Sequence, residues 1–224
     1  MAVYTKLTTH LGLFRNREVG MKSFNEIGAF YGTDKADISL HGHFAGNPGH
    51  NYMRYYERML GTYRADELTI VEIGVQYGYS LQAWDEIFPN ANVHGIDKSP
   101  LCAQEHMTRA KLHTFDATNL EECTAFFTKL GPVDVLIEDA SHQSQEQVNL
   151  FHALFRYVRS GGFYVIEDIG CGYQEYYGGG PDGGVTIQMV RSFIDDIHNG
   201  CSKSKITDIA GVHLFRDIAF VEKA

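Results

Sequence analysis

The chain has 224 residues, of which 44% are apolar, which is enough for one globular domain with a sizeable core. Its formal net charge of −9 argues against binding to nucleic acid or to anionic membranes, although it leaves room for a small ligand. The chain has no signal-peptide pattern and no apolar stretch of the length of a membrane span, and its four cysteines lack a CxxC spacing, so we expect a cytoplasmic protein with reduced thiols.

The first 67 residues predict helical or irregular structure, and we expect them to form a cap over one end of the remaining chain, residues 68–224. From residue 68 onward, short apolar runs alternate with amphipathic helical patterns. The expected strands cover 68–75, 92–97, 112–118, 132–139 and 161–169. The expected helices cover 80–88, 102–110, 120–130, 145–158 and 185–200.

Continuous apolar runs are typical of parallel strands covered on both faces, and their alternation with helices predicts a doubly wound α/β sheet. The end of the chain differs, because 206–224 indicates two strands joined by a short turn. A closing hairpin makes one strand antiparallel. This arrangement favours a Rossmann-like class I methyltransferase sheet, seven-stranded and mostly parallel, over the dehydrogenase type.

The first strand leads into VEIGVQYGYS (71–80), at the turn where a doubly wound sheet binds its ligand. Gly74 and Gly78 give the spacing E-x-G-x-x-x-G rather than G-x-G-x-x-G, so a dinucleotide is poorly supported. A tight turn without a ligand is the alternative for the glycines alone.

Acidic residues at the ends of the first three strands strengthen the prediction of a ligand site. Asp97 ends the second strand and can accept hydrogen bonds from ribose hydroxyls, and Asp116, near the end of the third, can meet an adenine amino group. Together with Glu72 they fit a cationic nucleoside such as S-adenosylmethionine better than an anionic dinucleotide. Ser80, at the end of the motif, is also expected to contact the cofactor.

Strands four and five each end in an acidic pair, Glu138-Asp139 and Glu167-Asp168. Neighbouring parallel strands lie about 4.8 Å apart, so carboxylates at their ends can converge on one ion. Oxygen ligands suit Mg²⁺, with Mn²⁺ or Ca²⁺ as alternatives. The competing interpretation is that these acids cap the following helices. We expect Asp139 to be a ligand, and Glu138, which points the other way along the strand, not to be one.

His142 follows Asp139 by three residues. A neutral imidazole there can remove a proton from a substrate hydroxyl. A polar surface histidine is the alternative, since the chain has eleven histidines.

Taken together, these motifs resemble those of metal-dependent, S-adenosylmethionine-using sugar O-methyltransferases, which include the macrolide mycinose and rhamnosyl enzymes and are similar to cephalosporin hydroxylase-like methyltransferases. The resemblance runs from FYGTDK (30–35) to VIEDI (165–169), and its most specific element is D-x-x-H followed, 28 residues after the Asp, by Glu-Asp. It implies that Asp139, Glu167 and Asp168 hold Mg²⁺ and that His142 is the general base.

Two further segments match the family, GTDK at Gly32 to Lys35 and H-x-Y-x-x-x-Y-E from His50 to Glu57. They suggest that Lys35 or Tyr52 approaches the methionine carboxylate of the cofactor. The Gly-rich segment 170–184 has no counterpart in the family pattern, which leaves the acceptor open.

The implied reaction is methyl transfer to a hydroxyl of a sugar with neighbouring hydroxyls, on a small natural product or a glycan. Gly178 to Gly184, preceded by Tyr173, Tyr176 and Tyr177, is either a lid that packs on the sugar ring or a surface loop. The alternatives are a catechol-type O-methyltransferase, a Rossmann oxidoreductase and a non-catalytic nucleoside-binding module. A homo-oligomer, with the N-terminal segment packed across a dimer, is also compatible with the sequence.

Overall fold

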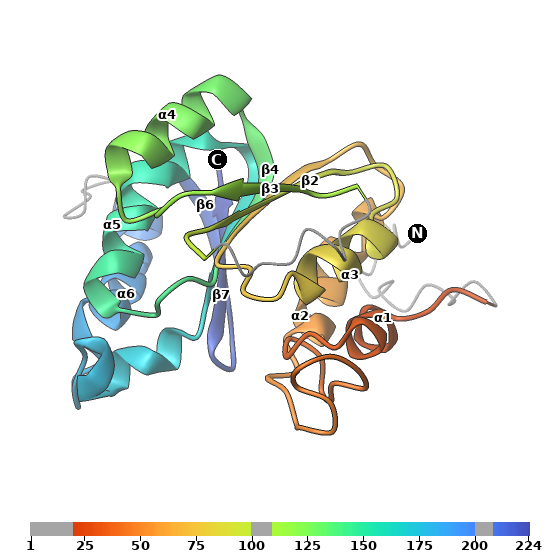
Figure 1. The fold of residues 1–224 in the computed structure, drawn as a ribbon. Helices are drawn as coiled ribbons and strands as arrows, with labels where there is room; N and C mark the ends of the chain where they lie inside the picture. The colour runs from red at the N-terminus through yellow and green to blue at the C-terminus, as the bar shows by residue number, and fades with distance from the viewer. Residues whose placement is uncertain (1–19, 100–108, 200–207) are drawn as a thin grey trace, which may run out of the picture.

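The computed structural model describes residues 20–99, 109–199 and 208–224, and its centre is a seven-stranded sheet (Figure 1). The strand order is β3-β2-β1-β4-β5-β7-β6, with the first five parallel and β7 antiparallel to both of its neighbours. This order confirms the expected fold class, including the C-terminal hairpin. The strands are β1 Thr69–Ile73, β2 Asn92–Asp97, β3 Lys111–Thr114, β4 Val133–Glu138, β5 Val158–Glu167, β6 Ile209–Phe215 and β7 Ile218–Lys223.

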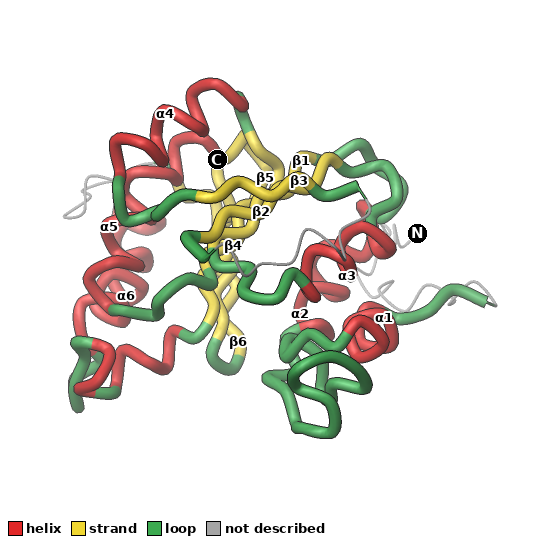
Figure 2. Tube along the Cα trace, viewed as in Figure 1, coloured by secondary structure: helices red, strands yellow, loops and turns green. Residues whose placement is uncertain are grey.

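Helices cover both faces of the sheet (Figure 2). One face carries α1 Phe24–Tyr31, α2 Met53–Leu60 and α3 Tyr79–Ile87, and the other carries α4 Leu120–Leu130, α5 Ser144–Leu154 and α6 Gly184–Asn199. Short 3₁₀ turns are η1 Gly61–Tyr63, η3 Phe155–Tyr157, η4 Ile169–Tyr173 and η5 Glu175–Tyr177. One hydrophobic core lies on each face of the sheet, and successive strand residues, such as Ile70 and Val71, pack into different cores. Because both faces are buried, the strands appear in the sequence as continuous apolar runs.

The N-terminal elements share a core with α3. Ser23 begins α1 with a capping box to Glu26. Phe24 packs edge-on against Phe88, and Tyr56 of α2 lies 4.9 Å from Trp84 of α3, measured between ring centroids. This packing holds the connection between α1 and α2 near the carboxyl ends of the parallel strands, where several of the predicted site residues lie.

Several predicted boundaries differ from the structure for local reasons. Strand β1 ends at Ile73 rather than 75, because Gly74 takes a left-handed φ of 87°. Helix α5 ends at Leu154 rather than 158. Strand β5 begins at Val158 rather than 161, because Val158 pairs with Val133 of β4. Gly161 (φ 72°) lies in the irregular stretch between this pair and the next one. The expected helix at 102–110 falls almost entirely outside the described residues.

Two further expectations concern the whole chain. Within the described part, Cys123 and Cys171 are free thiols, while Cys102 and Cys201 lie outside it. None of the described helices combines the length and the apolar character that crossing a bilayer requires.

Candidate active site

The turn after β1 lies close against the backbone that follows β4. A Cβ on Gly74 would lie 2.6 Å from the carbonyl carbon of Asp139 and 2.7 Å from Cα of Ala140. Gly78, also left-handed with a φ of 74°, is the N-cap of α3. The two glycines are therefore required for the turn to lie against the end of β4 and to lead into a helix.

The Asp97 carboxylate holds this turn in place. Its Oδ2 accepts hydrogen bonds from the backbone N–H of Val75 (3.0 Å) and Gln76 (2.9 Å), and its Oδ1 accepts one from Ser99 (2.7 Å). Asp116 accepts hydrogen bonds from the hydroxyl (2.8 Å) and backbone N–H (3.0 Å) of Thr118, which lower its pKa.

Two adjoining cavities lie along this edge of the sheet. A cavity of about 130 Å³ is lined by Asp116 and by apolar side chains that suit a planar base, Ile96, Phe115 and Ala117. A larger cavity of about 420 Å³ is lined by Lys35, Glu72, Ser80, Asp139, His142 and Asp168, among others. Gly74, Asp97 and Ala140 line both cavities. The predicted cofactor residues thus lie around one continuous site, except Tyr52 and Gly78, which line neither cavity.

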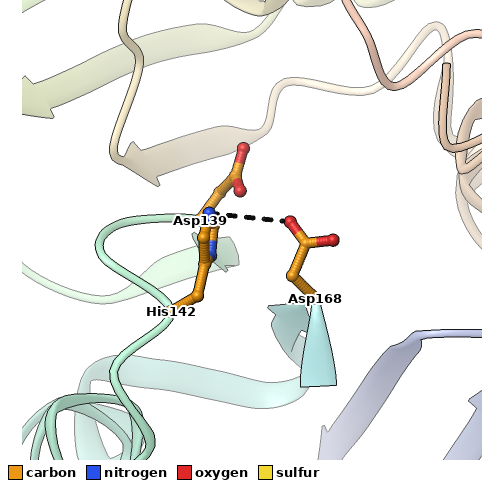
Figure 3. Close-up of side chains that lie close together, drawn as sticks. All are labelled: Asp139, His142 and Asp168. Carbon is orange, nitrogen blue, oxygen red and sulfur yellow. Dashed lines mark ion pairs between the residues drawn. The ribbon is translucent and has the colours of Figure 1, made fainter. Parts of the chain in front are cut away.

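Asp139, His142 and Asp168 converge at the wall of the larger cavity (Figure 3). Each offers one ligand atom, and these atoms lie within 4.8 Å of one another. Nε2 of His142 is 3.8 Å from Oδ2 of Asp168. His142 and Asp168 both have left-handed backbones, with φ of 58° and 53°. Residues other than glycine rarely adopt this backbone conformation, and those that do are often found at functional sites.

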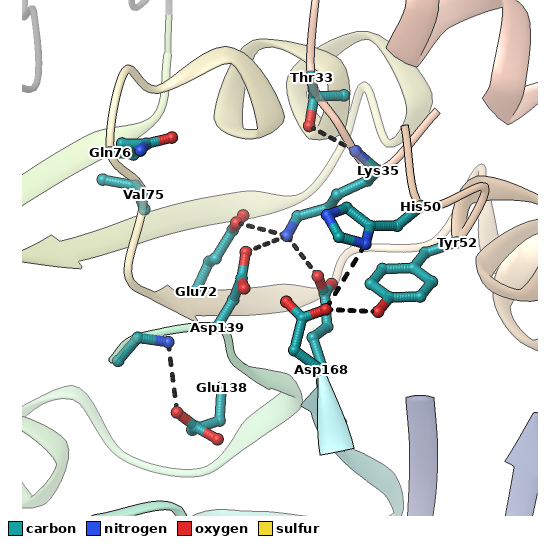
Figure 4. Close-up of polar contacts among 12 residues, drawn as sticks. Thr33, Lys35, His50, Tyr52, Glu72, Val75, Gln76, Glu138, Asp139 and Asp168 are labelled. Carbon is teal, nitrogen blue, oxygen red and sulfur yellow. Dashed lines mark hydrogen bonds and ion pairs between the residues drawn. The ribbon is translucent and has the colours of Figure 1, made fainter. Parts of the chain in front are cut away.

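A buried lysine faces the acidic residues from the N-terminal segment (Figure 4). Nζ of Lys35 donates to Oδ2 of Asp139 and to Oε2 of Glu167 (2.7 Å), and it lies 3.4 Å from Oε1 of Glu72. Burial lowers the pKa of Lys35, but the three carboxylates outweigh burial and hold it well above its usual range. The ammonium therefore stays charged.

The acids outnumber this single cation. Burial, together with repulsion from neighbouring carboxylates, raises the pKa of Glu167 to about 7 and raises the pKa of Asp139, and Lys35 opposes both shifts only in part. Glu138, by contrast, points away as expected. Its Oε1 accepts a hydrogen bond from the backbone N–H of Ala140 (3.2 Å), and burial raises its pKa to about 7.

Two tyrosines of the N-terminal segment donate hydrogen bonds to the acidic residues of the site. The Tyr52 hydroxyl donates to Oδ1 of Asp168 (2.7 Å), and the Tyr56 hydroxyl donates to Oε1 of Glu167. His50 lies 3.6 Å from Asp168. The role of Tyr56 was not anticipated, although its spacing of four from Tyr52 is the signal of a shared helix face. No pattern in the sequence predicted the hydrogen bond from Trp84 Nε1 to Oε2 of Glu72 (2.7 Å).

One tyrosine of the Gly-rich segment reaches the cavity. Tyr177, in η5, lines it with its ring 6.1 Å from the His142 ring in an edge-on arrangement. Tyr176 is 82% exposed and Tyr173 is 48% exposed. The Nε2 of Gln143, next to His142, donates to the Tyr176 carbonyl (3.4 Å), so this segment is attached directly to the His142 loop.

The donor set fits a hard divalent cation. The carboxylate oxygens of Asp139 and Asp168 converge beside the imidazole of His142. Lys35 faces more carboxylates than its one positive charge can neutralise, and a divalent cation would balance the remaining negative charge. Burial lowers the pKa of His142, so the ring is neutral at physiological pH and able to accept a proton. Its Nδ1 is buried and has no hydrogen-bond partner among the described residues.

Comparison with known proteins concerns the sequence and the fold. Residues 71–169, from β1 to the start of η4, match the family model of a methyltransferase domain. The fold and the matched residues thus define a Rossmann-like methyltransferase.

The chain is 31% identical over 196 residues to mycinamicin VI 2''-O-methyltransferase of Micromonospora griseorubida, covering 78% of this chain and 48% of that protein. It is 28% identical over 197 residues to 8-demethyl-8-(2-methoxy-alpha-L-rhamnosyl)-tetracenomycin-C 3'-O-methyltransferase of Streptomyces olivaceus, covering 78% and 49%. The structure of MycE methyltransferase in complex with Mg and SAH matches with a TM-score of 0.75 and 28% identity over 91% of this chain and 54% of that one. The chain is thus similar to these sugar O-methyltransferases, and it spans about half the length of the curated relatives it matches.

Proposed function

We propose that the chain transfers a methyl group from S-adenosylmethionine to a hydroxyl of a sugar, with Mg²⁺ bound at the ends of β4 and β5. The observation that carries this proposal is the convergence of Asp139, His142 and Asp168 within 4.8 Å, at the wall of a cavity that begins at the Gly74 turn. The relatives support the acceptor class, since they include O-methyltransferases that act on macrolide and rhamnosyl tetracenomycin compounds.

In this proposal S-adenosylmethionine supplies an electrophilic methyl group. The turn at Gly74 and the Asp97 carboxylate would hold its ribose, and the apolar cavity beside Asp116 would hold its base. Lys35 is enclosed by three carboxylates, and this favours a role in the charge balance of the site over contact with the methionine carboxylate.

Asp139 and Asp168 are the metal ligands best supported by their position, and a cation bound to them would lower the pKa of an acceptor hydroxyl. Glu167 is the third proposed ligand, and ligation by it requires Lys35 to give up its contact with Oε2. His142 accepts the hydroxyl proton at Nε2, the ring nitrogen facing Asp168. Tyr52 holds Asp168 through its hydroxyl.

The acceptor would enter beside Tyr177, whose ring forms the wall of the cavity next to His142. An acceptor with two neighbouring hydroxyls suits this site, because one can bind the cation while the other loses its proton. We further propose that the N-terminal segment up to residue 67, of which 20–67 are described and 1–19 lie outside the described residues, is a cap on the core that begins at residue 68, with Lys35 and Tyr52 contributed by the cap.

Calorimetry with S-adenosylmethionine and with NAD tests the cofactor. We expect binding heat from S-adenosylmethionine and none from NAD; NAD binding alone would exclude a methyltransferase and support an oxidoreductase. An acceptor panel of rhamnosyl compounds and catechols, assayed by mass spectrometry for a gain of one methyl, then separates sugar transfer from catechol transfer.

Substitution tests the proposed base. His142→Ala should lower kcat by about 10²- to 10⁴-fold while S-adenosylmethionine affinity stays close to that of the wild type. His152→Ala, an exposed histidine on α5, is the matched control and should leave both quantities unchanged. An unaltered kcat in His142→Ala would remove this residue from the mechanism.

A further inference from the structure

Three polar side chains lie fully buried behind the site, between α5, α6 and the end of β5. Ser144 and Thr186 are 0% exposed and Gln147 is 1% exposed, and none of the three lines either cavity along the sheet edge. We call them the buried network. Buried polar groups need hydrogen-bond partners, so the partners of these three show what the network holds together.

The first function of the network is to join two helix starts. The Thr186 hydroxyl donates to the Ser144 carbonyl (2.9 Å), and the Thr186 backbone N–H donates to Oγ of Ser144 (3.0 Å). Ser144 begins α5, two residues after His142, and Thr186 lies in the first turn of α6, directly after the Gly-rich segment. The His142 loop and the segment carrying Tyr177 are thus fixed to one another.

The second function is to orient Gln147. The single Thr186 hydroxyl proton is shared between the Ser144 carbonyl (2.9 Å) and Oε1 of Gln147 (3.0 Å), and Nε2 of Gln147 donates to the backbone carbonyl of Glu167 (2.9 Å). If the amide turned over, its oxygen would face the Glu167 carbonyl, another acceptor, so that carbonyl sets the orientation of the amide and the Thr186 hydroxyl holds Oε1 in it.

The network is bonded to Glu167, the last residue of β5, which directly precedes Asp168, and to Ser144, which follows His142 by two residues. His142 and Asp168 have left-handed backbones, a conformation that persists only where the surroundings enforce it. We propose that Thr186 is a positioning residue that, through Gln147 and Ser144, holds His142 and Asp168 in their arrangement beside Asp139. This inference rests on the proposed function, because it assigns Thr186 a role in the geometry of that reaction.

Two substitutions at Thr186 separate its hydroxyl from its shape. Thr186→Val keeps the shape and removes the hydroxyl, whereas Thr186→Ser keeps the hydroxyl. Thr128→Val is the matched control, since the Thr128 hydroxyl is exposed on α4 and bonds to the Thr124 carbonyl. Mg²⁺ affinity of the full chain, measured by calorimetry, should fall about 10- to 100-fold in Thr186→Val and stay near the wild-type value in the other two. In turnover, kcat should fall by a similar factor with little change in the KM of the acceptor.

Hydrogen–deuterium exchange gives a readout that needs neither metal nor substrate. Thr186→Val should raise exchange in residues 138–143 and 167–170 while leaving β2 close to the Thr128→Val control. Uniformly raised exchange, or equal impairment in Thr186→Ser, would show that Thr186 only packs the core and would overturn the proposal. Absence of S-adenosylmethionine and Mg²⁺ binding in the wild type would instead refute the proposed function, and the exchange pattern would still decide whether Thr186 orders the strand ends.

Discussion

Lys35→Met is the substitution whose effect the structure defines most sharply. The change keeps most of the side-chain volume and removes the ammonium that faces Asp139, Glu167 and Glu72. The lysine side chain is 2% exposed, and those of Glu72 and Glu167 are each 1% exposed, so solvent screens the remaining charges poorly. Removing one partner from a buried ionic group costs about 3–5 kcal/mol, because the remaining charges are left uncompensated.

The pH sets how much of this cost is seen. Carboxyl groups whose pKa is raised in the folded state favour folding when they are protonated and lose that contribution as the pH rises through the folded pKa. Burial raises the pKa of Glu167 to about 7 and shifts Asp139 in the same direction. The loss of stability in Lys35→Met should therefore be largest near pH 8 and smaller near pH 5, where these carboxyls carry protons.

Urea denaturation without metal at pH 8 and pH 5 measures the free energy of unfolding directly. Lys22→Met is the control, because Lys22 pairs with Glu86 at 3.0 Å with a side chain that is 55% exposed. Exposed pairs contribute only about 0–1 kcal/mol. The assignment of Lys35 as the counter-charge of the buried acids would be refuted by either of two results. One is a loss of unfolding free energy at pH 8 that is no larger in Lys35→Met than in Lys22→Met, and the other is a loss in Lys35→Met that grows toward pH 5. Added Mg²⁺ should restore more stability to Lys35→Met than to the wild type.

Three further outcomes follow from single positions. Gly74→Ala should abolish S-adenosylmethionine binding in calorimetry, because its Cβ would meet the backbone of Asp139; Gly161→Ala, equally left-handed but with open space around it, should cost only about 1–2 kcal/mol in urea denaturation and still bind. Burial lowers the pKa of His94 to about 4, so folding should lose up to about 3 kcal/mol as the pH falls from 6.5 toward 4; His94→Gln should show much less of this loss, and an equal loss would contradict the assignment. Tyr177→Ala should raise the acceptor KM more than it lowers kcat, and an unchanged KM would place the acceptor elsewhere.

The sheet and the strand-end residues could be predicted from sequence because they depend on local periodicity. Parallel strands put their carboxyl ends on one edge, so Asp139 and Asp168 had to be neighbours once β4 and β5 were identified. The orientation of Glu138 away from the cavity follows from the alternation of side chains along β4, whereas the turn at Gly74 was expected from its glycine.

The groups that hold these residues depend on contacts between distant parts of the chain. Lys35 lies 104 residues from Asp139 and 132 from Glu167, and no periodic pattern indicates where a connecting segment will lie. The family pattern singled out Lys35 and Tyr52 but could not show that they face acids. The buried network gave no signal, because Thr186 follows a Gly-rich segment and reads as the start of an ordinary helix.

Methyl transfer with and without metal tests the central claim most directly. The full chain is incubated with S-adenosylmethionine and a rhamnosyl acceptor, in Mg²⁺ or in EDTA, and the acceptor and S-adenosylhomocysteine are quantified by mass spectrometry. We predict equal amounts of methylated acceptor and S-adenosylhomocysteine in Mg²⁺, and neither in EDTA or in Asp139→Ala at any Mg²⁺ concentration. Full methylation in EDTA, or undiminished methylation by Asp139→Ala, would contradict the assignment of Asp139, His142 and Asp168 as a metal-assisted catalytic site.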